Sequence, residues 1–308
     1  WDSPLGLEIK SIFRSNVIGL PQTEPMFTAV FVHPQASIKL LTQVRNLVYV
    51  FTLDKQSGGS KFLQKRISED TKQKINSDTS FFQSVMKDEY ARGQEVMYLF
   101  GKTESELIHN LKQNKERILD YFNVIERKRL QANLLSTKST TGFTEMLSKE
   151  VKCELSFPIG YVLADKKEAF YWFRQIDANM DKDIFIAWKP YVSEYQLLPD
   201  SIVFWRDEIA RANLFEDPEN PESYLLTEKV NADVFARQMS LNKNFAMEVR
   251  GLWKTNNLSM GGSFIGYALV DEKNSRLFYI EGFTYAPGRN KREIMRELEA
   301  ILWTFKLN

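Results

Sequence analysis

The sequence contains very little cysteine or histidine. Cys153 is the only cysteine in 308 residues, so an internal disulfide cannot form. Thiol redox chemistry or a cysteine-rich metal site is not expected, and a lone free cysteine is usually a small buried hydrophobic residue. The two histidines, His33 and His109, are far apart in the sequence, at positions 33 and 109. A histidine-based zinc site is therefore not predicted, and we expect no metal.

The chain also lacks an excess of charge and a long apolar run. It has 41 basic and 40 acidic residues, with a net charge of +1, so no overall field attracts nucleic acid or an acidic membrane. The longest compact apolar run, NLVYVFTL, has the length of a strand and falls well short of the ~18 residues that span a bilayer. The chain opens at WDSPLGLEIK without a methionine, and we expect a processed or trimmed chain whose targeting segment lies outside it.

Motifs for nucleotides and for standard catalysis are missing. There is no phosphate-binding loop and no dinucleotide fingerprint, so no cofactor is predicted. GGSFIG resembles a nucleophile elbow only loosely, because Ile265 stands where a second glycine belongs. DANMDKD at 177–183 has the acidic spacing of a calcium loop, but Lys182 and Trp188 stand where glycine and glutamate are needed. We interpret this segment as a hairpin tip rich in turn-forming residues.

The composition that remains is typical of a globular protein, with 43% apolar and 26% charged residues. Periodicity predicts helices and strands mixed along the chain. It indicates an α+β fold with mostly antiparallel sheets and helices packed on one face. We expect two α+β units, 1–150 and 151–308. The main predicted helices span 4–14, 104–135, 201–213, 232–240 and 290–306.

An internal echo raises the hypothesis that the two halves are related. VMYLFGKT at 96–103 aligns with LFYIEGFT at 277–284, and a predicted amphipathic helix follows each. A strand that ends in Gly-x-Thr and leads into a helix therefore occurs twice. Such units are common in α+β proteins, so chance similarity is the alternative to duplication.

Candidate binding residues gather in the C-terminal third. Glu248, Arg250 and Glu281 lie in predicted strands among apolar neighbours, so they either face solvent or form a polar pocket. In GLWKTNNLSMGG at 251–262, Trp253 and Met260 either pack on a sheet or line a ligand pocket. Alternation with Val249 predicts a buried Trp253, near the start of helix 290–306. Tyr285 completes the candidate ligand-binding set, and no catalytic residue is assigned.

This C-terminal region resembles an uncharacterised lipoprotein family of Bacteroidetes, known only as a domain of unknown function. The resemblance rests on RGLW, MGGSF, VDE, EGFTYAP and a terminal helix with KR and LEA. GLPQTEPMF at 19–27 and DEYARGQ at 88–94 extend it over nearly the whole chain. The family has no assigned activity, so the resemblance supplies no catalytic residues. It also implies a strand before the first helix that this chain lacks.

The resemblance implies an exported protein, anchored to the membrane only through an N-terminal lipid outside this chain. We therefore expect a non-enzymatic lipoprotein of the cell envelope, facing the periplasm or attached to the outer membrane. Its partner would be an unknown envelope ligand or protein, and its role would be binding or structural. The alternative is an envelope hydrolase that uses carboxylates such as Glu248 and Glu281. A separation of ~5–9 Å between the two carboxyl groups across a cleft would favour this alternative. Carboxylates that point to opposite faces of the sheet would exclude it.

Overall fold

We analysed a computed structural model of the chain, which describes residues 1–34, 41–136, 141–177, 179–217 and 220–308. The chain divides into two compact units. Unit 1 comprises residues 1–15 and 25–122, and unit 2 comprises residues 16–24 and 123–308. The boundary lies inside helix α6 (Lys115–Leu134) and not near residue 150, because the apolar stripe of this helix is buried only as far as Phe122.

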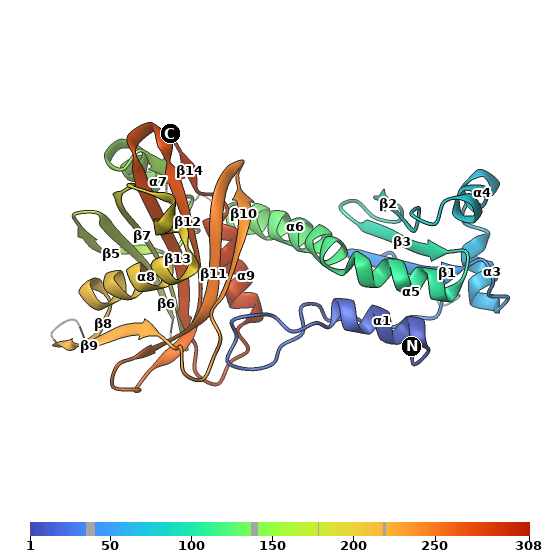
Figure 1. The fold of residues 1–308 in the computed structure, drawn as a ribbon, viewed down its shortest axis with the longest axis horizontal. Coiled ribbons are helices and arrows are strands. Elements are labelled where there is room, and N and C mark those ends of the chain that lie inside the picture. The colour runs from blue at the N-terminus through green and yellow to red at the C-terminus, as the bar shows by residue number, and fades with distance from the viewer. Residues whose placement is uncertain (35–40, 137–140, 178, 218–219) are drawn as a thin grey trace. The chain divides into compact units, whose positions relative to one another are not determined.

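Unit 1 is built on a three-stranded mixed sheet with the order β1-β3-β2 (Figure 1). Strand β3 is buried along its whole length between a parallel and an antiparallel neighbour. Helices cover both faces of this sheet: α1, α5 and α6 pack on Met97 and Leu99, and α3 and α4 pack beside Tyr98 and Phe100. The elements are α1 (Pro4–Phe13), β1 (Asn46–Thr52), α3 (Gly58–Gln64), α4 (Glu69–Ser77), β2 (Gln83–Lys87), β3 (Glu95–Gly101), α5 (Glu104–Gln113) and the first part of α6.

Unit 2 is built on a nine-stranded antiparallel sheet with the order β5-β6-β7-β13-β12-β11-β9-β8, and β10 also pairs with β11. Its sheet strands are β5 (Val162–Lys167), β6 (Phe170–Asp177), β7 (Met180–Pro190), β8 (Phe215–Asp217), β9 (Asn220–Thr227), β10 (Phe235–Leu241), β11 (Asn244–Thr255), β12 (Gly261–Asp271) and β13 (Arg276–Tyr285). Its other elements are α7 (Thr141–Glu150), β4 (Cys153–Glu154), the short helices η1 (Glu194–Leu197) and η2 (Glu272–Asn274), α8 (Pro199–Asn213), α9 (Arg292–Leu302) and β14 (Lys306–Leu307).

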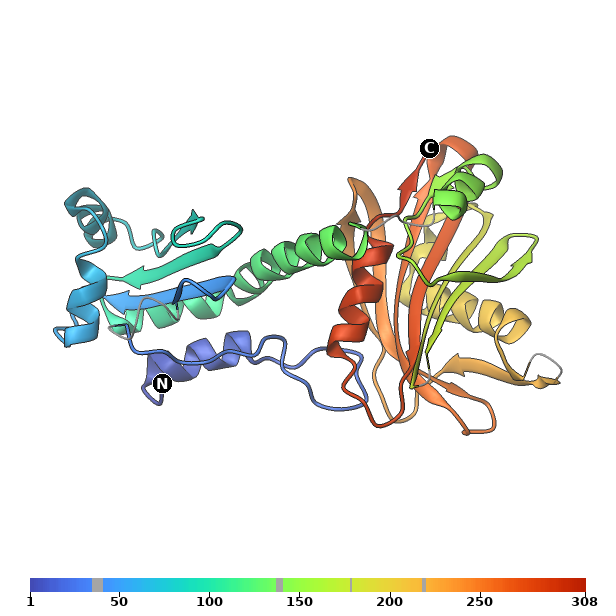
Figure 2. The same ribbon diagram turned by 180° about the vertical axis from the view of Figure 1, so that it is seen from behind.

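Helices cover both faces of this large sheet, whereas the sequence analysis predicted helices packed on one face. Helix α8 packs on the face that carries Phe264 and Tyr279, here called the α8 face. Helix α9 packs on the opposite face, the α9 face, with Ile265 and Phe278 (Figures 1 and 2). Strands β12 and β13 are buried at nearly every position, so their sequences are apolar on both faces. The α+β class with mostly antiparallel sheets is confirmed.

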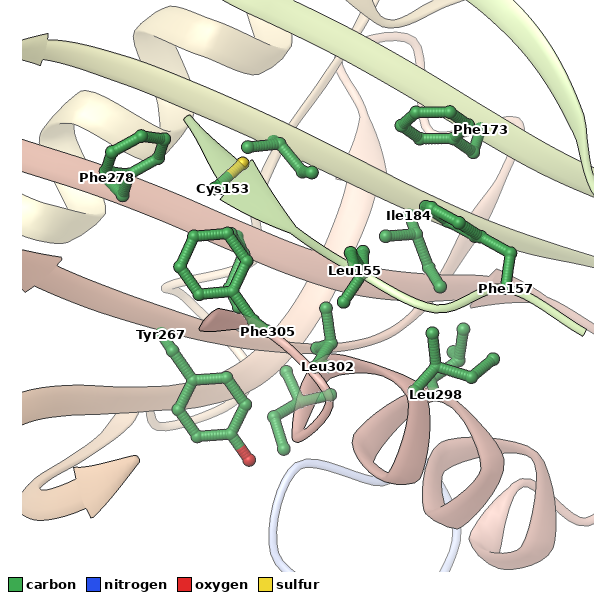
Figure 3. Close-up of a cluster of buried hydrophobic side chains, with 14 of the residues drawn as sticks. Cys153, Leu155, Phe157, Phe173, Ile184, Tyr267, Phe278, Leu298, Leu302 and Phe305 are labelled. Atoms are coloured by element: carbon green, nitrogen blue, oxygen red, sulfur yellow. The ribbon is translucent and has the colours of Figure 1, made fainter. Parts of the chain in front are cut away.

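Cys153 belongs to the core of the α9 face, as expected for a small buried residue. Its side chain lies in a cluster with Leu155, Phe278, Leu302 and Phe305 (Figure 3). The thiol is fully buried and unpaired, and burial raises the pKa of Cys153 to about 12. It therefore remains a neutral thiol at physiological pH and contributes packing.

Two details of the expected fold are different. The segment predicted as helix 232–240 is strand β10, which forms a hairpin with β11. The two residues between these strands, Asn242 and Lys243, both have positive φ, which is the backbone of a tight two-residue hairpin turn. The echoed segments also have different neighbours, because β3 pairs with one parallel strand and β13 with two antiparallel strands. The sheet topology does not support a duplication.

Candidate functional site

Glu281 on β13 forms a buried ion pair with Arg206 of α8. Arg206 Nε and Nη2 donate to the two carboxylate oxygens at 2.8 and 2.7 Å. Both side chains have no exposed surface. Tyr279 Oη donates to the same carboxylate at 2.6 Å, and Arg206 Nη1 donates to Thr227. Burial raises the pKa of Glu281, while Arg206 opposes the rise. This carboxylate joins α8 to the sheet, and it lines neither of the two cavities described below.

Glu248 and Arg250 on β11 belong to a chain of charges on the opposite, α9 face. Arg250 Nε donates to Glu248 at 2.9 Å, and its Nη2 donates to Glu299 of α9 at 3.0 Å. Glu299 also accepts from Arg127, whose guanidinium stacks on the Trp303 ring at 3.3 Å from the centroid. Burial would raise the pKa of Glu248, but Arg250 and Arg237 outweigh it and lower this pKa.

Glu248 and Glu281 therefore point to opposite faces of the large sheet. Glu248 pairs in register with Tyr267, which lies on the α9 face, and Glu281 lies beside Tyr279 and Phe283 on the α8 face. Two carboxylates on opposite faces cannot act across one cleft. The alternative of a hydrolase that uses Glu248 and Glu281 together is therefore not supported.

Trp253 is 2% exposed, which confirms that its ring is buried. Its indole Nε1 donates to the carbonyl of Thr284 at 3.3 Å, and its ring meets Phe283 edge to face. The expected position near the start of α9 is wrong, because Trp253 packs on the α8 face. Trp253 and Val249 do share one face of β11, but the helix that covers this face is α8.

The segment GLWKTNNLSMGG is the end of β11, a turn and the start of β12. Gly262 has no room for a side chain, because a Cβ there would lie 1.9 Å from the Thr284 carbonyl oxygen and 2.8 Å from the Trp253 indole nitrogen. The glycine thus lets the indole reach its hydrogen-bond acceptor. Trp253 and Met260 from the two sides of this hairpin meet on the α8 face.

The hairpin tip at the β6–β7 turn lines an open cavity of about 580 Å³. This volume lies within the ~300–1,000 Å³ range of small-molecule sites. The turn is stabilised by Asp177, whose carboxylate accepts the backbone N–H of Asn179 at 2.8 Å. The cavity is lined by Asp177, Asn179, Met180, Asp181, Tyr285, Pro287 and Arg289. Its wall therefore mixes carboxylate, carboxamide, guanidinium and phenol groups with two apolar side chains.

A second, smaller cavity of about 50 Å³ adjoins it on the α8 face. The two share Asp181 and Tyr285, and we call them the outer and inner cavities. The rest of the inner cavity is mostly aromatic and aliphatic. It is lined by Trp172, Arg174, Asp183, Leu214, Phe215, Leu225, Trp253, Met260 and Phe283 in addition to the two shared residues.

The charged groups of the inner cavity are organised by Arg174. Its Nε donates to Asp183 at 2.7 Å and its Nη2 donates to Asp181 at 3.0 Å. Trp172 Nε1 also donates to Asp183 at 3.0 Å. Asp183 is only 2% exposed, and burial raises the pKa of this carboxyl to about 7, with Arg174 opposing the rise. Asp181 lies nearer to solvent, and its side chain is 21% exposed.

The structure brings together three of the six sequence-predicted residues. Trp253, Met260 and Tyr285 line the inner cavity, whereas Glu248, Arg250 and Glu281 do not. The calcium interpretation of 177–183 is not supported, because Arg174 holds Asp181 and Asp183. Across the described ranges, no group of three or more potential ligands could hold a metal ion. The hairpin interpretation is confirmed by β6 and β7 for the residues that surround position 178, which lies outside the described residues.

Sequence reasoning missed Trp172 and Arg174 altogether. It considered Asp181 and Asp183 for a calcium loop and interpreted them as turn residues, not as part of a cavity wall. The alternation FYWFRQID in β6 was the available signal, because it places Trp172 and Arg174 on one face.

Among the helices in the described part of the chain, none has the length and apolar character needed to cross a membrane.

The structure thus defines a two-unit α+β protein whose second unit carries a paired cavity at one end of a large antiparallel sheet. Residues 140–304 match the family described as Domain of unknown function (DUF4837), and the chain belongs to this family. Residues 1–135 match Domain of unknown function (DUF8532). The resemblance to an uncharacterised domain family is confirmed to this extent.

The wider comparisons add little. No curated protein matches the chain. The Ran-binding protein Mog1p of Saccharomyces cerevisiae is similar at 8% identity with a TM-score of 0.33, over 51% of this chain and 90% of that one. A structure from Bacteroides thetaiotaomicron is similar at 12% identity with a TM-score of 0.27, over 51% of this chain and 45% of that one. Similarity at this level carries no argument about function.

Proposed function

We propose that this chain is a non-catalytic binding protein of the bacterial cell envelope. Unit 2, which contains the residues that match DUF4837, would bind a small polar molecule in the outer cavity. The observation that carries this proposal is the cavity of about 580 Å³, which has both hydrogen-bonding and apolar groups on its wall. Convergent polar groups within a concave surface of this size are typical of small-molecule sites.

The buried carboxylates of the two faces support binding rather than catalysis. Glu281 is held bidentately by Arg206, and Glu248 is held by Arg250. Each is an ion-paired group between packed elements, and a general acid or base must instead be within reach of the substrate. The carboxylates nearest to solvent at the cavity, Asp177 and Asp181, belong to a hairpin turn and an Arg174 pair.

The envelope location is proposed from the lipoprotein resemblance of the RGLW, MGGSF and EGFTYAP motifs. Attachment would use a lipid on an N-terminal cysteine outside this chain. Fractionation of the complete protein in its native host tests this part. We expect it in the membrane fraction and release into the soluble fraction after removal of the lipidated cysteine. Recovery of the complete protein from the cytoplasm, without lipid, would overturn the location.

The binding proposal is tested by a small-molecule library screened against residues 1–308 by thermal shift, with titration calorimetry on each hit. Asp181→Asn should weaken binding of the hit, because Asp181 lines both cavities. Asp233→Asn is the matched control, since Asp233 is exposed and lines neither cavity. Binding that is equal in the wild type and both variants would place the ligand elsewhere. Turnover of a hit, followed by NMR, would contradict a purely binding role.

A further inference from the structure

The inner cavity has a size and lining that select a small apolar group. Its volume is about 50 Å³, which is enough for a few heavy atoms, since a water needs only ~10–15 Å³ on this measure. Trp172, Trp253, Met260 and Phe283 supply most of its apolar wall. The charged side chains of this cavity, Arg174, Asp181 and Asp183, are bonded to one another, so a charged or strongly hydrated group would have to compete with these bonds to replace its water shell. A methyl group would enter without that cost.

The junction of the two cavities offers one acceptor beside one donor. Asp181 lines both cavities and Arg174 lines the inner one, and their side chains are 3.0 Å apart. A carboxylate accepts an amide N–H, and a guanidinium donates to an amide carbonyl. In the hydrogen bonds described above, Arg174 uses Nε and Nη2, and Asp181 uses Oδ2. A secondary amide at this junction would therefore accept from Arg174 Nη1 and donate to Asp181 Oδ1, with its acyl carbon chain directed into the inner cavity.

The outer cavity is suited to the hydroxyl groups of a sugar ring. Asp177, Asn179 and Arg289 present planar groups with two or more hydrogen-bonding atoms each. Such groups can engage neighbouring hydroxyls in pairs. Tyr285 adds an aromatic ring with a polar tip. The mixture of acidic, basic and amide side chains matches a neutral polyol better than a ligand of one charge.

We propose that the two cavities together bind an N-acetylated amino sugar. The acetyl methyl group enters the inner cavity, the amide lies beside the Asp181–Arg174 pair, and the ring lies in the outer cavity against Tyr285. This inference rests on the proposed binding function and names the ligand class for the same site. The acetamido group distinguishes this ligand from a plain hexose, a free amino sugar and an amino acid.

The test uses residues 1–308 with N-acetylglucosamine, N-acetylgalactosamine and N-acetylmannosamine, each beside its parent hexose and its free amine. Titration calorimetry should show at least one N-acetyl sugar binding ~10-fold or more tightly than both counterparts, because a filled apolar subsite is worth about that factor. Saturation-transfer NMR should give its strongest signal at the acetyl methyl. Equal affinities within every set, or transfer only to ring protons, would overturn the inference.

Two variants separate the subsites. Met260→Phe enlarges a side chain on the inner wall and should reduce affinity for the N-acetyl sugar ~10-fold while binding of the parent hexose stays the same. Arg174→Gln should reduce it similarly, because the shorter side chain no longer places a donor beside the amide carbonyl. Asp233→Asn is the control, and thermal unfolding checks that each variant folds. Loss of hexose and N-acetyl sugar binding in equal measure would contradict a dedicated acetyl pocket.

The outcomes also distinguish this inference from the proposed function. If no N-acetyl sugar binds but a different small molecule binds in an Asp181-dependent manner, the binding function stands and the sugar assignment fails. If neither any sugar nor any library compound depends on Asp181, both fail. An N-acetyl sugar whose affinity is unchanged by Met260→Phe and Arg174→Gln would bind elsewhere, and this result would also reject the assignment.

Discussion

The two faces of the large sheet bury charge in different ways. On the α8 face, Arg206 and Glu281 are both completely buried and close on one another through two hydrogen bonds. On the α9 face, Glu248 begins a chain through Arg250 and Glu299 to Arg127 whose other members retain 12–16% exposure. Among the described residues, Arg206 is the only cation that pairs with Glu281, whereas the charges of the chain on the α9 face are shared with water.

The faces also differ in how far they are covered. Helix α9 and strand β4 both pack over the α9 face. The core residues in Figure 3 fill the space between these two elements and the sheet. The inner cavity lies on the α8 face, and the outer cavity adjoins it at the β6–β7 turn and the end of β13. The inner part of the candidate site thus lies on the α8 face.

The largest expected effect comes from breaking the closed pair. Arg206→Leu would leave Glu281 buried without its counter-charge, and we expect the free energy of unfolding to fall by about 3–5 kcal/mol. Urea denaturation measures this loss. The double variant Arg206→Leu/Glu281→Leu should recover most of it, because a well-packed apolar pair removes the desolvated charge. A single variant as stable as the wild type would show that Glu281 is protonated or solvated.

The second-largest effect is expected from removing the Trp253 ring, which lines the inner cavity. Trp253→Ala should lower the free energy of unfolding by about 3 kcal/mol, the lower end of the usual range, because water can enter the enlarged cavity. Leu258→Ala in the same hairpin is the control, since Leu258 is 71% exposed and should change stability by less than ~0.5 kcal/mol. Equal effects of the two variants in thermal and urea unfolding would contradict the burial of the indole.

The faces should also respond differently to pH. The folded pKa of Asp183 is raised to about 7 from 3.8, so the folded state holds a proton that the unfolded chain has lost. Its contribution to stability is therefore present at pH 4 and decreases as the pH rises to about 7, at no more than ~1.4 kcal/mol per unit. Because Arg174, the partner of Asp183, is partly exposed, solvent screens the pair. We therefore expect the free energy of unfolding to fall by about 2 kcal/mol in total between pH 4 and 7.

Comparison with Asp183→Asn isolates this group from its charged neighbours Arg174 and Asp181. The variant should show a flatter decline in unfolding free energy between pH 4 and 7. Glu248 on the α9 face should behave in the opposite sense. Its pKa is lowered in the folded state, so it adds stability at neutral pH, and this stability is lost as the pH falls below the ordinary pKa of a glutamate. Parallel pH profiles for wild type and Asp183→Asn would contradict the raised pKa.

The fold class could be predicted because local periodicity determines it. The helices at 4–14, 201–213 and 290–306 are present as α1, α8 and α9 within a few residues. The helix predicted at 232–240 failed because pairing with β11 overrides local preference. Two covered faces could have been read from the uninterrupted apolar runs in β12 and β13.

The candidate site was only half predictable. Trp253 and Met260 were found because they stand out within one hairpin, but their partners Trp172 and Arg174 are some 80 residues away in the sequence. Sequence alone also left the face of Glu248 and Glu281 undetermined, since it does not give strand register. In the structure, several residues of the RGLW, MGGSF and EGFTYAP motifs have packing roles. A Cβ at Gly282, for example, would approach Leu298 of α9 to 2.9 Å.

The smallest expected effect is at Glu24, in the GLPQTEPMF segment. Helix α9 begins at Arg292, and Lys291 before it provides no side-chain cap. Glu24 takes this role: its carboxylate accepts the backbone N–H of Lys291 at 2.6 Å and that of Arg292 at 3.1 Å. Residues from two motifs of the family resemblance, at opposite ends of the chain, thus meet at one helix terminus. A negative charge there also interacts favourably with the helix dipole.

Glu24→Ala should therefore lower the free energy of unfolding by about 1–2 kcal/mol, as loss of a helix cap does. Hydrogen exchange should become faster at the Lys291 and Arg292 amides, while amides of β10 stay protected. Glu24→Gln keeps an acceptor oxygen without the charge and should lose less. The α8 face should be unaffected, so affinity for any ligand of the cavities should remain that of the wild type. Unchanged exchange at the two amides in Glu24→Ala would show that α9 is capped in another way.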